Sequence, residues 1–203
     1  MANFHFYFVS CALLLTLSWR TAAGVPVRTQ DAEQCSPHFK ELLLSITDLL
    51  NDPNLCYGIT SDKVVVRSQA ETLLACAPTL TPNSSCMIQR NSSFSESECL
   101  RNIMKDLVYY EAIINSYMAS PRRSPEEEDK RLNPTLDKIK HLKNCSLMLN
   151  EDNDSTEKVA AKMWGKDTFS NRQEMCKMMR GFHVRTITIN RAMGYISSGD
   201  HRK

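Results

Sequence analysis

The sequence predicts an all-α protein: a long-chain four-helix bundle with up-up-down-down topology, a long first crossover loop and disulfide staples. Four segments repeat apolar residues every three or four positions, which is the spacing of one helix face. The first two are separated by 52–96, a stretch rich in Pro, Ser, Thr and Asn. This length suits an overhand connection between helices that run in the same direction. Eight cysteines are available for staples.

The composition is that of one globular domain. Of 203 residues, 42% are hydrophobic and 24% charged, and only 6 are Gly, which excludes collagen-like and low-complexity chains. The 25 Lys and Arg nearly balance the 23 Asp and Glu, for a net charge of +2. This balance argues against a non-specific nucleic-acid binder, so we expect no nucleic-acid partner.

The N-terminus predicts a secretion signal over 1–23. The apolar run Phe4–Leu17 is followed by small residues and is shorter than the roughly 20 residues of a membrane-spanning helix. We expect cleavage after Ala23 or Gly24, with an uncleaved membrane anchor as the alternative. No later segment is long and apolar enough to span a bilayer. The remainder, 24–203, is therefore expected to be a single secreted, extracellular domain without membrane insertion.

The first three helices follow from periodicity and capping signals. The first covers about 37–51, with Pro37 near its start; in the crossover, a short strand at Val64–Val66 and a short helix at Ser68–Cys76 are candidates. The second opens with the capping box Ser95-x-x-Glu98. The third opens at Ser124-Pro125, unless Pro134, which should kink it, marks the true start.

The last helix, about 168–197, carries two stripes. One is an ordinary core stripe: Met175, Met179, Phe182, Thr186, Ile189, Met193 and Ile196. Beside it run Val184, Thr188, Arg191 and Tyr195, with Arg185 and Ile187 at the margins. Arg and Tyr are enriched at the energetic centres of protein interfaces, so this second stripe predicts a partner-binding face. A solvated helix edge is the alternative.

The cysteine count is odd once the leader is removed. Cleavage takes Cys11 and leaves seven: Cys35, Cys56, Cys76, Cys86, Cys99, Cys145 and Cys176. In an oxidising compartment one of seven must bond to another chain or stay free. Without Cys-x-x-Cys or ligand spacing among the histidines, we expect no metal site.

Four N-x-S/T sequons agree with secretion. We expect glycans on Asn83, Asn91 and Asn153. Asn144 lies in a helical pattern beside a cysteine, which makes its use doubtful.

Motifs of catalysis are missing from the sequence. It has no Gly-x-Ser-x-Gly, His-Glu-x-x-His, glycine-rich phosphate loop or EF-hand loop. The acidic run Glu126–Asp129 fits a helix start, where the helix dipole favours negative charge. His38, His141 and His183 are isolated in sequence and suit surface or boundary positions. We expect neither an enzyme nor a cofactor.

The segment Gly181–Ile196 closely resembles the last helix of the interleukin-12 alpha subunit family. Cys76–Cys86 is similar to that family's glycosylated loop, and Cys99–Glu111 to part of its second helix. The resemblance covers most of the chain after the leader and is weakest in 57–70 and 119–170.

This resemblance implies a cytokine chain that forms half of a heterodimer with a beta subunit built like a soluble receptor, and that signals through cell-surface cytokine receptor chains. It implies an interchain disulfide at Cys86 and an Arg191 side chain inserted into a pocket of the beta subunit. Arg185, Thr188 and Tyr195 map beside Arg191. The resemblance also implies the bridges Cys56–Cys176 and Cys76–Cys99.

One departure from the family concerns Cys35, whose usual partner shortly before the second helix is missing here. Cys145 is present instead, and in an up-up-down-down bundle the end of the third helix lies near the start of the first. We therefore predict a Cys35–Cys145 bridge. Two alternatives to the heterodimer remain: a free-standing helical cytokine, and a disulfide-bonded helical carrier or enzyme.

Overall fold

The computed structural model describes residues 30–52, 55–56, 59, 70–77, 94–145 and 160–199. The leader 1–23, Val64–Val66, Cys86 and the sequon residues Asn83, Asn91 and Asn153 lie outside these residues. Within the described part, secondary structure is helical without strands: α2 (Gln30–Asn51), α3 (Ala70–Cys76), α4 (Glu96–Met118), α5 (Pro125–Lys143) and α7 (Thr168–Ser198).

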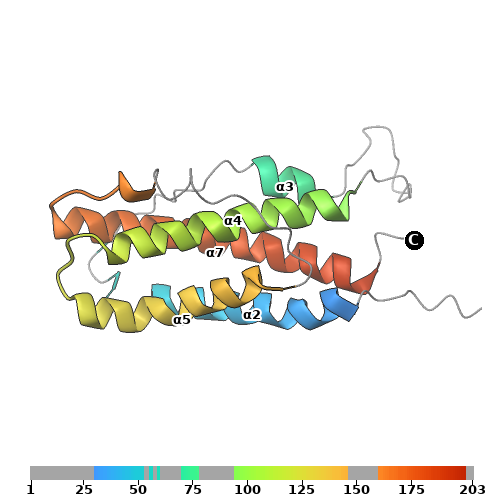
Figure 1. Ribbon diagram of the computed structural model, residues 1–203, viewed down its shortest axis with the longest axis horizontal. Helices are drawn as coiled ribbons and strands as arrows, with labels where there is room; N and C mark the ends of the chain where they lie inside the picture. Colours follow the sequence, from blue (N-terminus) through green and yellow to red (C-terminus); the bar gives the residue numbers. More distant parts are fainter. Residues whose placement is uncertain are drawn as a thin grey trace, which may run out of the picture.

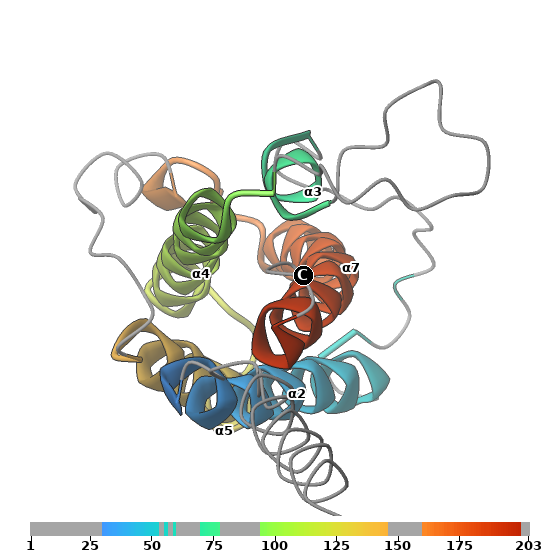
Figure 2. The same cartoon turned by 90° about the vertical axis from the view of Figure 1, so that its right-hand side faces the viewer.

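The four long helices have the predicted up-up-down-down topology. Helices α2 and α4 run in one direction, and α5 and α7 run back (Figure 1). Seen down the bundle, α4 and α7 lie on one side and α2 and α5 on the other, while α3 lies outside against α4 and α7 (Figure 2). The short helix α3 belongs to the connection between α2 and α4, so the long first crossover is confirmed.

The core lies along the bundle axis and is built from the predicted stripes. Phe39 and Ile46 of α2 are fully buried, as are Tyr110 of α4 and Phe182 of α7. The rings of Tyr110 and Phe182 stack with their centroids 4.0 Å apart. Stacked aromatic rings bury large apolar areas, so this contact stabilises the packing of α4 against α7 within the core.

Helix α2 begins earlier than the sequence predicted. It starts at Gln30, so Pro37 lies inside the helix and does not mark its first turn. The added turns contain Cys35, which is 2% exposed and bonded to Cys145. Packing of this segment against the end of α5 therefore outweighs the local preference of proline for a helix start.

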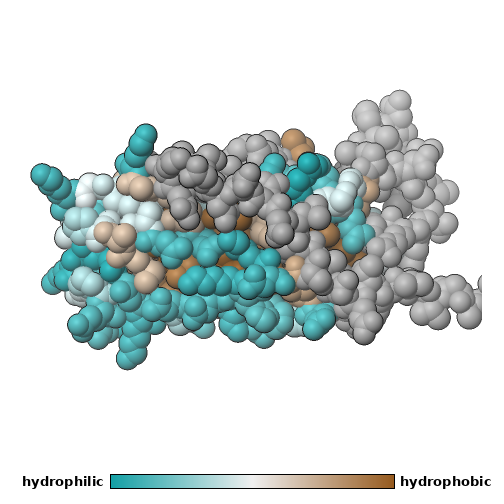
Figure 3. Space-filling model, in the orientation of Figure 1, coloured by the Kyte–Doolittle hydropathy of each residue, from teal (hydrophilic) through white to brown (hydrophobic). Residues whose placement is uncertain are grey.

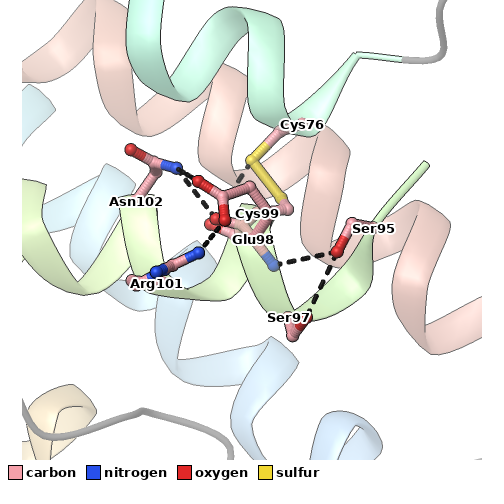
Figure 4. A network of polar contacts seen from close by, with 7 residues as sticks. All are labelled: Cys76, Ser95, Ser97, Glu98, Cys99, Arg101 and Asn102. Carbon is pink, nitrogen blue, oxygen red and sulfur yellow. Dashed lines mark hydrogen bonds and ion pairs between the residues drawn. A yellow bond between two sulfur atoms is a disulfide. The ribbon is translucent and has the colours of Figure 1, made fainter. Parts of the chain in front are cut away.

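The start of α4 confirms the capping serine. Ser95 accepts a hydrogen bond from the Glu98 N–H at 3.3 Å (Figure 4). The Glu98 carboxylate accepts from the Asn102 side-chain amide at 3.1 Å and pairs with Arg101. Cys99, one position on, bonds to Cys76 and thereby holds α3 to this end of α4.

Helix α5 begins where the sequence predicts, with Ser124 before it and Pro125 as its first residue. Ser124 is the N-cap residue, but its side chain makes no capping bond. Its backbone N–H instead donates to the carboxylate of Glu128, at 3.4 Å, and Glu128 also accepts from the buried Tyr117 hydroxyl at 2.7 Å. Helix α5 then runs through Pro134 to Lys143, so Pro134 does not begin it.

Three disulfides staple the bundle. They join Cys35 to Cys145, the predicted bridge, and Cys56 to Cys176 and Cys76 to Cys99, the two bridges that the family resemblance implies. The first two span 110 and 120 residues, so they connect elements distant in the chain.

Candidate partner-binding face of helix α7

Helix α7 is capped at both ends. Asp167 caps its first turn by accepting from the N–H groups of Phe169 and Ser170. The Ser170 hydroxyl also donates to Asp167, and together these bonds hold the pKa of the Asp167 carboxyl below its usual value. Gly199 ends the helix with a φ of 70°, the left-handed conformation that glycine adopts without strain.

The inner face of α7 is the predicted core stripe. All seven of its residues are buried: Met175, Met179, Phe182, Thr186, Ile189, Met193 and Ile196. The Thr186 hydroxyl donates to the Phe182 carbonyl at 2.6 Å, so the one polar side chain of the stripe is satisfied within the helix.

The opposite side of α7 forms an outer face. Val184 is 49% exposed and Arg191 is exposed, while Ile187, Thr188 and Tyr195 are partly exposed. Residues spaced by three and four positions lie above one another on a helix, so Val184, Thr188, Arg191 and Tyr195 form one continuous strip. The structure thus brings together five of the six residues predicted for the partner-binding face.

The prediction for the sixth residue, Arg185, is wrong. Its side chain is 4% exposed, and its Nε lies 3.3 Å from Oδ2 of Asp106 in α4. Asp106 also accepts from the Thr72 hydroxyl of α3, at 2.6 Å, and all three residues are buried. One position beyond Val184, the helix rotation of about 100° turns the Arg185 side chain toward α4 and away from solvent.

The crossover borders the outer face at both ends. Near its start, Arg180 of α7 donates to the Ile59 carbonyl at 3.1 Å. Near its end, the rings of Tyr195 and Phe94 meet edge to face with centroids 5.3 Å apart. Phe94 lies two positions before α4, and α3 packs against α7, so the two ends of the segment between Cys76 and Cys99 lie close to α7.

Helix α3 adds exposed apolar side chains that the sequence analysis did not single out. Leu73 and Leu74 are 49% and 69% exposed, whereas Thr72 and Cys76 of the same helix are buried. Figure 3 shows apolar surface at the upper edge of the molecule, where α3 lies. The sequence contains a signal for this arrangement. Thr72 and Cys76 are four positions apart and so share the inward face of the helix, which leaves the adjacent Leu73 and Leu74 facing outward.

The histidines that are isolated in sequence acquire partners in the fold. The rings of His38 and His141 meet edge to face with centroids 4.4 Å apart, joining α2 to α5. His183 Nε2 lies 3.1 Å from the Thr47 hydroxyl. Among the residues that the structure describes, no group of three or more His, Cys, Asp or Glu could hold a metal ion. No helix in the same ranges combines the length and apolar character needed to cross a membrane.

An up-up-down-down bundle with a long crossover, disulfide staples and a mixed apolar, arginine and tyrosine strip on its last helix has the architecture of a helical cytokine. The comparison with known families agrees with this class. The interleukin-12 alpha subunit family matches residues 5–199, and the chain belongs to that family of cytokine subunits.

Individual relatives are distant but cover most of both chains. The chain is 25% identical to the horse (Equus caballus) interleukin-12 subunit alpha over 190 residues, which is 81% of this chain and 82% of the relative. It is 24% identical to the cat (Felis catus) subunit over the same shares, and 23% identical to the human subunit over 87% of this chain and 90% of the relative. No solved structure gives a significant match.

Proposed function

We propose that this chain is the alpha subunit of a secreted heterodimeric cytokine, and that the outer face of α7 binds a beta subunit built like a soluble receptor. The observation that carries the proposal is the strip of exposed and partly exposed residues Val184, Thr188, Arg191 and Tyr195 on a helix whose opposite face is core. An exposed Arg beside Tyr and apolar side chains has the composition of an interface centre. The assembled heterodimer would signal through cell-surface cytokine receptor chains.

Cysteine pairing supports a covalent link through Cys86. Six of the eight cysteines are joined in intrachain disulfides. Of the other two, Cys11 lies in the proposed leader 1–23, which leaves Cys86 for the partner. The Cys76–Cys99 bond closes the segment that carries Cys86 into a loop, and the ends of that loop belong to α3 and α4.

Helix α3 is proposed to extend the partner-binding face. Its two exposed leucines lie on the element that precedes the Cys86 loop, and α3 packs against both α4 and α7. The buried bond from Thr72 to Asp106 and the Cys76–Cys99 disulfide fix α3 in place. A fixed apolar pair loses little conformational freedom on binding, which favours its use at an interface.

The secretory route is part of the proposal. Residues 1–23 would be removed as a signal peptide, and the single domain 24–203 would be exported with glycans on Asn83, Asn91 and Asn153. The proposed role is that of a protein-binding subunit, with no catalytic reaction and no cofactor.

Co-secretion with an interleukin-12-type beta subunit tests the proposal. Wild type and Cys86→Ser would be compared on gels with and without reductant, with Ser84→Ala as a control change in the same loop that keeps Cys86. We expect a covalent heterodimer from wild type and Ser84→Ala, and a heterodimer held by contacts alone from Cys86→Ser. Secretion of a monomer in every case, active on receptors without a partner, would favour the free-standing cytokine instead.

A further inference from the structure

The end of α5 places one sequon residue on the surface. Asn144, in the triplet Asn144-Cys145-Ser146, is the C-cap residue of α5, not part of its interior, and it is exposed. Its backbone N–H donates to the His141 carbonyl at 3.2 Å. The cap therefore uses the main chain of Asn144, and the side chain stands at the end of the helix where solvent reaches it.

The residue after Asn144 is tied to another helix. Cys145 is bonded to Cys35, which is 2% exposed in α2. The middle residue of the triplet is thus fixed against α2 in the folded protein, and Asn144 itself has helical backbone angles, φ −86° and ψ 0°.

We propose that Asn144 is N-glycosylated while the chain folds, and that closure of the Cys35–Cys145 disulfide limits the fraction of molecules that receive the glycan. This inference rests on the secretory route proposed above. In the transfer, the Asn144 amide nitrogen forms a bond to the anomeric carbon of a lipid-pyrophosphate-linked oligosaccharide. The bond from that carbon to the pyrophosphate oxygen breaks, the lipid pyrophosphate leaves, and the amide gives up one proton to a base.

The two reactions compete for the same triplet. Glycosyl transfer needs Asn144 and Ser146 in an accessible, adaptable segment. Closure oxidises the thiols of Cys35 and Cys145, and their two electrons and two protons pass to a disulfide oxidant of the secretory compartment. Cys35 precedes Cys145 by 110 residues, so during synthesis it enters the compartment first and is available when the triplet arrives. Once the bond has closed, Asn144 is held at the capped end of α5 and Cys145 is held against α2.

A glycan at Asn144 is compatible with the proposed partner face. Helix α5 packs against α2 and α4 but not against α7 within the described residues, so it lies diagonally across the bundle from α7 (Figure 2). Helix α3 lies on the side of the bundle away from α5. We therefore expect assembled heterodimer to contain chains with and without the Asn144 glycan.

Occupancy mapping of the full chain tests the inference. Chains from secretory cells would be treated with peptide N-glycosidase in heavy-oxygen water, and conversion of Asn144 to labelled Asp would be measured by mass spectrometry. The comparison is wild type against Cys35→Ser, which keeps the triplet, with Ser146→Ala as the variant that removes the acceptor. We expect partial occupancy in wild type and a rise of about twofold or more in Cys35→Ser.

A second experiment opens the disulfide without a substitution, so that the result does not depend on whether Cys35→Ser folds and is secreted. Wild-type chains pulse-labelled in cells under mild reductant would have the Cys35–Cys145 bond open without any substitution, and their Asn144 occupancy should rise in the same way. An unmodified Asn144 in wild type, in Cys35→Ser and in reductant-treated chains would overturn the inference. Equal, complete occupancy in all of them would overturn the competition. Absence of glycan at every sequon together with an uncleaved leader would instead contradict the secretory route itself.

Discussion

Arg185 and Arg191 lie on the same helix and meet opposite surroundings. Arg185 is 4% exposed and pairs with Asp106 across the α4–α7 contact, whereas Arg191 is exposed on the outer face. Six positions along a helix amount to a rotation of about 240°, which is enough to move a side chain from the core to solvent. The comparison separates two roles on one helix: the inner face holds the bundle together, and the outer face is the one that we propose binds a partner.

This separation has an energetic meaning. A change on the inner face should lower the free energy of unfolding, because buried groups lose packing or pairing. A change on the outer face should leave unfolding nearly unaltered and should act on association with the beta subunit. Unfolding is therefore the quantity to measure for inner-face changes, and both unfolding and association are to be measured for changes elsewhere on α7.

The largest effect is expected for the Cys56–Cys176 bridge, which ties the inner face of α7 to the segment after α2. Cys176 is fully buried, and the bridge spans 120 residues. The double variant Cys56→Ser/Cys176→Ser should lose about 5 kcal/mol of unfolding free energy by the loop-entropy relation, which is roughly a third or more of the stability of an ordinary domain. Denaturant titration of the secreted chain measures the loss, and the Cys76→Ser/Cys99→Ser variant, with its shorter loop, should lose less. Equal losses would contradict the loop-length argument.

The next largest effect is expected at Arg185. Replacing it by Ala leaves the buried Asp106 carboxylate without its cation and should lower the unfolding free energy by about 3–5 kcal/mol. The triple variant Thr72→Val/Asp106→Leu/Arg185→Met makes the network apolar at similar volume and should recover most of that stability. The denaturant midpoints of wild type, Arg185→Ala and the triple variant measure these differences in unfolding free energy. A wild-type midpoint for Arg185→Ala would mean that the inner-face pair contributes little.

Arg191 should show the reverse pattern. In a Cys86→Ser background, Arg191→Ala should weaken association with the beta subunit by about 2 kcal/mol, or roughly 30-fold in Kd, if Arg191 is a binding hot spot. Its unfolding free energy should change by no more than about 0.5 kcal/mol. Binding by calorimetry and unfolding by denaturant would be measured on the same samples. Arg123→Ala, an exposed arginine in the turn between α4 and α5, serves as the matched control and should change neither.

The sequence predicted the inner face of α7 and most of its outer face because both follow from the 3.6-residue period of one helix. It predicted the Ser95 cap because capping depends on residues four positions apart or fewer. The pairing of Cys35 with Cys145 followed from topology, since it depends only on which helix ends lie together.

The features that the sequence did not predict depend on contacts between distant elements. Arg185 was assigned outward because nothing near it in the sequence indicates Asp106 and Thr72, which α4 and α3 bring to it. Pro37 predicts a helix start, but tertiary packing extends α2 to Gln30. At the start of α5, the Ser124 N–H donates to Glu128, whose carboxylate also accepts from the Tyr117 hydroxyl of α4, a contact that the sequence near α5 does not indicate.

The smallest effect is expected at Asp167, which lies at the start of α7 and belongs to neither face. Its carboxyl has a pKa below the usual value because Ser170 and the first N–H groups of α7 hydrogen-bond to the charged form. The folded-state pKa is therefore lower than the unfolded one. The charge stabilises the fold above the unfolded pKa, and this contribution disappears as the pH falls through the folded pKa.

Asp167→Asn keeps a capping oxygen and removes only the charge. At neutral pH the variant should unfold slightly more easily than wild type, because the helix N-terminus favours an anion. Their denaturant midpoints should converge as the pH is lowered below the ordinary pKa of aspartate. Affinity for the beta subunit should be the same for both proteins, since Asp167 lies more than four helical turns before Val184 and the rest of the outer face. A constant difference at all pH values would assign the effect to cap geometry and not to charge. A change in affinity would mean that the partner-binding face extends to the start of α7, and the division of the helix into two faces would then have to be redrawn.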